Sequence, residues 1–136
     1  MVAFENQLPI ACGAIKEYDT TTFEIKRMYT APVHRRKGVA AKILSELEKW
    51  AIELGYKKCI LETGKKQPEA LHLYKKCGYV KINNYGQYAG IENSICFEKK
   101  LKLVKSYFHG LTARLVDPKR KLQDYAVKND DLLNRL

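Results

Sequence analysis

A basic loop punctuated by one glycine constrains this chain more than any other feature of its sequence. The loop spans residues 32–38, follows a strand-like segment at 23–29, and precedes apolar residues at helical spacing from Val39 onward. This order places free backbone N–H groups and the side chains of Arg35, Arg36 and Lys37 at a helix N-terminus. Such an arrangement suits a phosphorylated ligand. The alternative is a helix that simply starts after a basic loop.

Length and composition indicate one soluble domain. The chain has 136 residues, of which 46% are hydrophobic and 29% charged, as in globular proteins. We expect no signal peptide and no membrane association, because the start has no basic segment followed by an apolar run. The scattered cysteines Cys12, Cys59, Cys77 and Cys96 predict free thiols and a cytoplasmic location. We expect no metal, since no cluster has ligand spacing.

The net charge of +10 favours an anionic partner. Coenzyme A, a nucleic acid and an acidic protein all satisfy this condition. A specific nucleic-acid module would add interleaved aromatic residues on a sheet or a recognisable reading helix. Neither feature is evident, so nucleic-acid binding is the alternative here and not the expectation.

Apolar periodicity predicts a meander of strands followed by alternating helices and strands. We expect strands at 2–4, 10–15, 23–29, 59–61, 79–82 and 94–97, a long helix from Val39 to a glycine cap at Gly55, and a short helix between Pro68 and Gly78. This order predicts an α/β fold with a mixed sheet. Two further apolar stripes predict a helical extension at 102–136, beyond a core at 1–101.

Two motifs occur in this order, each in its expected structural context. Residues 35–40 read Arg-Arg-Lys-Gly-Val-Ala and fit the form Q/R-x-x-G-x-G/A. Residues 67–79 fit the form N-x-x-A-x-x-L-Y-x-x-x-G-F/Y, with Gln67 in place of the commoner Asn. Together they resemble the GCN5-related N-acetyltransferase (GNAT) superfamily over about residues 2–101. The resemblance implies a mixed, mainly antiparallel sheet with helices on both faces.

The chain departs from that family at both ends. Its first strand resembles the family's second strand, so we expect the chain to lack the usual opening strand and two helices, which form part of the acceptor pocket in the family. The extension at 102–136 has no family counterpart. We hypothesise that the extension packs on the core of its own chain or on a dimer mate. In the second case the protein is a homodimer.

The resemblance implies an N-acetyltransferase that moves an acetyl group from acetyl-CoA to a primary amine by direct attack in a ternary complex. Two alternatives stay open on the same fold, a non-catalytic CoA-binding protein and a basic nucleic-acid-binding protein. The sequence does not identify the acceptor, because one fold serves many substrates.

The resemblance also assigns a cofactor site. The pyrophosphate is expected on the amides of residues 36–40, with added contacts from the basic side chains. The main chain of Met28, Tyr29 and Thr30 is expected to pair with the pantetheine arm, unless ordinary sheet pairing uses it. The full set of expected cofactor-binding residues is Met28, Tyr29, Thr30, Arg35, Arg36, Lys37, Gly38, Val39, Ala40 and Gln67.

Three side chains are candidates for the chemistry. Tyr74 matches the family tyrosine that protonates the leaving thiolate, and the alternative is a core aromatic residue. Glu24 stands eleven residues before Arg35, where relatives place a general-base glutamate, and the alternative is a solvated carboxylate on an exposed-looking strand. Glu62 is the competing base. Either carboxylate could act through water, and a mechanism without a dedicated base also remains open.

Overall fold

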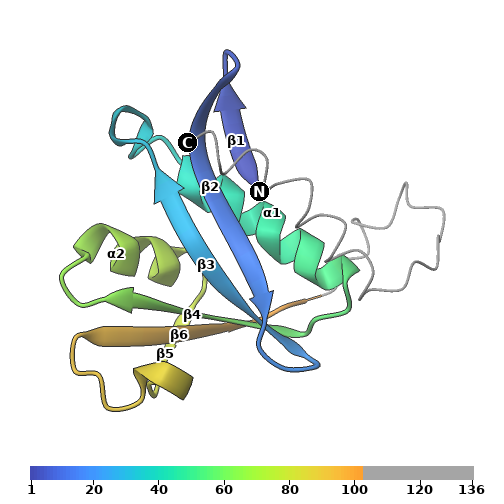
Figure 1. Cartoon of the computed structure of the whole chain (residues 1–136), viewed down its shortest axis with the longest axis vertical. Coiled ribbons are helices and arrows are strands. Elements are labelled where there is room, and N and C mark those ends of the chain that lie inside the picture. The colour runs from blue at the N-terminus through green and yellow to red at the C-terminus, as the bar shows by residue number, and fades with distance from the viewer. Residues whose placement is uncertain (103–136) are drawn as a thin grey trace. The chain divides into compact units, whose positions relative to one another are not determined.

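Six strands and two α-helices form residues 1–102, the part of the chain that this computed structural model describes (Figure 1). In chain order the elements are β1 (Val2–Glu5), β2 (Leu8–Glu17), β3 (Thr22–Thr30), α1 (Val39–Glu53), β4 (Lys58–Gly64), α2 (Pro68–Lys76), β5 (Val80–Ile82) and β6 (Ser94–Lys100). The strand order is β1-β2-β3-β4-β6-β5, with β3 and β4 parallel and the other pairs antiparallel. The predicted mixed, mainly antiparallel sheet is therefore confirmed.

Helix α1 packs directly on β2 through a glycine. Its apolar stripe, which includes Ile43 and Leu47, is buried, as its helical periodicity predicts. A Cβ atom added at Gly13 would lie 2.7 Å from the Met28 sulfur and 2.9 Å from a Leu47 methyl carbon. The absence of a side chain at Gly13 thus lets the helix approach the sheet closely. This contact fixes α1 against β2 and β3.

Both described helices pack on the same face of the sheet, so within residues 1–102 the expected arrangement of helices on both faces is not observed. Phe97 and Lys99 alternate with Glu98 on β6, so they share a face. The Phe97 ring centroid lies 6.0 Å from that of Tyr74 on α2. The Lys99 ammonium lies 2.8 Å from the Glu48 carboxylate on α1. The extension predicted at 102–136 lies outside the described residues, except for its first residue.

Strands β3 and β4 pair at one end and then separate. Their ladder stops at Glu24 and Ile60, so residues 25–30 of β3 and 61–64 of β4 do not pair with each other (Figure 1). The register of β2 with β3 also shifts, opposite Arg27, which has a φ of +57°. This β-bulge bends the strand. Tyr29 and Thr30 consequently pair with β2 alone. The other edge of β3 at these residues faces the opening where β3 and β4 separate.

Candidate active site

A groove of about 780 Å³ runs between the start of α1 and α2. Its walls come from the basic loop, the first turn of α1 and one side of α2. Six of the predicted cofactor residues line it: Thr30, Arg35, Arg36, Gly38, Val39 and Ala40. The structure therefore brings most of the first motif to a single concave surface beside the second motif.

The N-terminus of α1 has unpaired donors at this groove. Gly38 is the N-cap residue, no side chain caps the helix, and no acidic residue occupies the first turn. Amides in the first turn of a helix have no acceptor within the helix. Gly38 has a φ of +77°, and a Cβ atom there would meet nothing within 4 Å. The left-handed backbone, and not crowding within the chain, is what favours glycine at this position.

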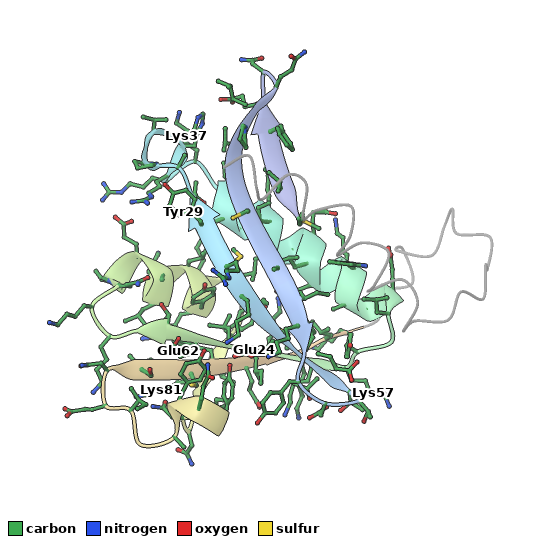
Figure 2. All side chains as sticks on the ribbon, viewed as in Figure 1. Glu24, Tyr29, Lys37, Lys57, Glu62 and Lys81 are labelled. Carbon is green, nitrogen blue, oxygen red and sulfur yellow. The ribbon has the colours of Figure 1, made fainter. Side chains whose placement is uncertain are left out.

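Contacts hold two of the basic side chains at the groove. The Arg35 Nε donates to the carbonyl oxygen of Thr30 over 2.8 Å. The Arg36 guanidinium lies 2.8 Å from the Glu69 carboxylate and so links the loop to α2. This hydrogen bond raises the pKa of Arg36 and lowers that of Glu69. Lys37 lies on the same loop (Figure 2) and is not among the described residues that line the groove.

A smaller cavity, of about 260 Å³, occupies the opening between β3 and β4. Residues 25–28 of β3 and 62–64 of β4 form its two sides. Tyr74 from α2 and Tyr88 from the short helix η2 (Gly86–Tyr88) complete the lining, together with Gln67. The predicted residues Met28, Glu62, Gln67 and Tyr74 thus meet here. Helix α2 and strand β3 each contribute residues to both cavities.

Tyr74 is buried against aromatic rings, with its centroid 5.9 Å from that of Tyr79 and 6.0 Å from that of Phe97. Burial raises the pKa of Tyr74 to about 12, so the phenol stays protonated at neutral pH. No hydrogen bond from its hydroxyl occurs within residues 1–102, and no fully buried polar side-chain atom there lacks a partner. The hydroxyl therefore reaches the cavity with its proton free to donate.

The two candidate carboxylates occupy different environments on neighbouring strands (Figure 2). Glu24 is only 7% exposed, so the solvated-carboxylate alternative is wrong. Its Oε1 lies 2.7 Å from the Lys26 ammonium and accepts a hydrogen bond from the Tyr85 hydroxyl at 2.8 Å. Glu62 is half-buried and lines the smaller cavity, whereas Glu24 is not among the described residues that do so.

Sequence reasoning missed the residues that surround Glu24. The Lys26 ammonium donates to the Tyr88 hydroxyl at 2.7 Å and lies 5.0 Å from the centre of that ring. Tyr85 and Tyr88 pack edge to face with centroids 5.6 Å apart. The signal available was a loop with tyrosines three residues apart, and Lys26 two residues after Glu24 on the same strand face.

Within residues 1–102, no group of three or more His, Cys, Asp or Glu side chains is arranged to hold a metal ion. Neither α1 nor α2, the two described α-helices, is long and apolar enough to cross a membrane.

Comparison with known proteins agrees with this geometry. Residues 1–79 match the model of the acetyltransferase (GNAT) family. The chain belongs to this family. It is 38% identical over 101 residues to the uncharacterized N-acetyltransferase YsnE of Bacillus subtilis, covering 73% of this chain and 67% of YsnE. It is 30% identical over 102 residues to the IAA acetyltransferase of Azospirillum brasilense, covering 74% and 67% of the two chains.

The fold is also that of solved family members. A GNAT family acetyltransferase from Elizabethkingia anophelis, solved with acetyl-CoA bound, superposes with a TM-score of 0.65 at 22% identity, covering 74% of each chain. The chain spans about two thirds of the length of the two curated relatives. These matches confirm the predicted family and fold, and they support the predicted enzyme class, an acyl-CoA-dependent N-acetyltransferase.

Proposed function

We propose that this protein binds acetyl-CoA in the groove and transfers the acetyl group to a primary amine by direct attack in a ternary complex. The observation that carries the proposal is a pair of cavities built on the same helix α2 and strand β3, with Tyr74 lining the smaller one. The acetyl-CoA bound in the Elizabethkingia relative supports the choice of cosubstrate. The N-acetyltransferase name of the Bacillus relative supports an amine acceptor.

The groove and the adjoining edge of β3 offer partners for two parts of the cofactor, the pyrophosphate and the pantetheine arm. The pyrophosphate would lie on the free amides of the first turn of α1, where the helix dipole also favours an anion. Arg36 would exchange Glu69 for phosphate oxygens, and Arg35 and Lys37 would add positive charge. The pantetheine arm would pair with the free edge of β3 at Met28, Tyr29 and Thr30, in place of β4.

In the reaction, the amine nitrogen attacks the thioester carbonyl carbon and forms the new C–N bond. The C–S bond then breaks, and the thiolate takes the proton of Tyr74. The acceptor enters as an ammonium ion and loses one proton to Glu62 through a water molecule before it attacks. Its second proton passes to water after the C–N bond forms, and exchange with solvent returns Tyr74 and Glu62 to their starting protonation states. Glu62 is the better placed base because it lines the cavity, whereas Glu24 is buried behind Lys26. Alignment of the two reactants supplies much of the acceleration.

Calorimetric titration with acetyl-CoA tests the groove, and two glycine variants provide a matched pair. Gly38 and Gly55 both have positive φ, and a Cβ atom at either meets nothing within 4 Å. Gly38→Ala and Gly55→Ala should therefore lose similar stability, about 1 kcal/mol each. Only Gly38→Ala should weaken acetyl-CoA binding, by about tenfold, because its methyl group lies at the phosphate site.

Desulfo-CoA and ATP serve as ligand controls, and acetylation of an amine panel completes the test. Equal affinity in wild type and both variants would contradict the cofactor placement. Binding of acetyl-CoA without acetylation of any amine would favour the non-catalytic alternative. Salt-dependent RNA binding without acetyl-CoA affinity would favour the nucleic-acid alternative.

We also infer a cytoplasmic location, supported by the four cysteines, which are all free. The homodimer stays a prediction, and the molar mass of the protein in solution tests it.

A further inference from the structure

The smaller cavity has walls of opposite charge. Lys26 and Arg27 come from the β3 side, and Glu62 comes from the β4 side. Lys26 and Glu62 alternate with residues that face the two helices, so they project from the other face of the sheet. Tyr88 also lines the cavity, with its hydroxyl 2.7 Å from the Lys26 ammonium. An acceptor that enters from this face meets a cation and a phenol on one side and a carboxylate on the other.

Lys26 and Tyr88 retain donors for such a molecule. The Lys26 ammonium has three N–H groups and uses one on Glu24 and one on the Tyr88 hydroxyl. Tyr88 accepts from Lys26, and within residues 1–102 its own proton is not donated to any protein group. Burial alone would lower the pKa of Lys26, but its bonds to Glu24 and Tyr88 raise it above its usual value. Lys26 and Tyr88 therefore each keep one N–H or O–H donor for a ligand, and Lys26 stays positively charged at neutral pH.

The charges of the site balance for a zwitterion. Lys26 and Arg27 carry two positive charges at the cavity, and two negative charges match them, one on Glu62 in the lining and one on Glu24, which pairs with Lys26 outside it. A bound molecule would remove water from these groups, and charges taken out of water must be compensated. A bound molecule with one amine and one carboxylate leaves this balance intact, whereas a diamine would bring a second positive charge toward Lys26. The volume of about 260 Å³ is below the range of about 300–1,000 Å³ common for drug-sized ligands. The site therefore suits a small molecule.

We propose that the acceptor is a free amino acid, whose carboxylate accepts hydrogen bonds from Lys26 and Tyr88 while its amine lies beside Glu62. This inference rests on the proposed function and gives it a substrate class. Lys26 and Tyr88 then act as specificity residues for the acceptor, distinct from the groove that holds the cofactor.

A matched acceptor series tests the proposal with the full chain. The probes are the twenty L-amino acids, the carboxamide of each, and putrescine as a diamine. Acetylated products are measured by mass spectrometry at saturating acetyl-CoA. We expect at least one amino acid to exceed its own carboxamide by about tenfold or more in kcat/KM, because the amide lacks the charge that the two donors stabilise.

Two variants and one control test whether Lys26 and Tyr88 cause the preference for an amino acid over its carboxamide. The ratio below is kcat/KM for the acid divided by kcat/KM for the amide. Lys26→Met should bring the ratio of acid to amide close to one. Tyr88→Phe should lower the ratio by a smaller factor while it preserves the Lys26–Glu24 pair, so it serves if Lys26→Met does not fold. Lys81→Met removes the same charge from an exposed site on β5, outside the smaller cavity, and should leave the ratio unchanged. Acetyl-CoA affinity, measured by calorimetry, should stay the same in all three variants.

The outcomes separate this inference from the proposed function. If acetyl-CoA binds and carboxamides or putrescine are acetylated better than amino acids, the proposed function stands and the inference is overturned. A preference for acids that survives both Lys26→Met and Tyr88→Phe also overturns it. If acetyl-CoA does not bind the wild-type protein, the proposed function fails and the inference fails with it.

Discussion

At the scale of single residues, Tyr74 combines a buried ring with a hydroxyl that faces the cavity. Replacing it with Phe keeps the contacts with Tyr79 and Phe97 but removes the proton donor. We expect Tyr74→Phe to lower kcat by about 100-fold, with little change in acetyl-CoA affinity. Steady-state kinetics and calorimetry on the same preparation measure the two quantities.

Tyr79→Phe is the control for this change. The Tyr79 hydroxyl donates to Glu48 at 2.8 Å, outside both cavities, so its loss should affect stability more than turnover. An equal loss of affinity and turnover in Tyr74→Phe would point instead to a purely structural role for Tyr74.

The two carboxylates should respond differently to neutralisation. Glu62→Gln should lower kcat by about 100-fold without a loss of stability, because Glu62 is half-buried and lines the cavity. Glu24→Gln should lower the free energy of unfolding by about 1–3 kcal/mol, because it leaves Lys26 without its anionic partner. Urea melts and kinetics on both variants distinguish the roles, and the opposite pattern would make Glu24 the base.

At the scale of elements, the contact between α1 and β2 depends on the absence of a side chain at Gly13. Gly13→Ala places a carbon within 3.0 Å of atoms of Met28, Ile43 and Leu47. We expect a loss of about 1–3 kcal/mol in stability, measured by denaturant unfolding. Gly64→Ala is the matched control, since its nearest contact is a backbone oxygen at 4.0 Å. A Gly13→Ala protein as stable as the control would show that α1 has room to move.

The patterns along the chain predicted the elements well but not the β3 bulge. The predicted strand at 23–29 is observed as Thr22–Thr30, and the long helix begins at Val39 as expected. The positive φ at Arg27 had no signal in the sequence, because arginine rarely adopts this conformation and glycine usually marks it. The bulge is a product of sheet geometry.

At the scale of the whole molecule, buried weak acids predict a loss of stability in alkali. Burial raises the pKa of Tyr74 from 10.0 to about 12, and that of Cys59 from 9.0 to about 12. The unfolded chain therefore releases these protons at lower pH than the folded chain does. Stability from these groups is complete below about pH 9 and declines as pH rises through about 12.

Urea unfolding at a series of pH values between 7 and 12 measures this decline. Burial raises the pKa of Tyr79 as well, so Tyr79→Phe should show a shallower decline than wild type. A free energy of unfolding that stays constant up to pH 11 would contradict the prediction.

The sequence by itself determined the features set by neighbouring residues. The loop at residues 32–38, its glycine and the start of α1 follow from local chemistry, and so does the spacing that puts Tyr74 on α2. The tertiary structure alone decided the environment of the carboxylates. Glu24 accepts a hydrogen bond from Tyr85, which is 61 residues away, and the smaller cavity needs residues from β3, β4, α2 and η2 at once. Local periodicity carries no information about contacts at such separations, because only the packed sheet brings those segments together.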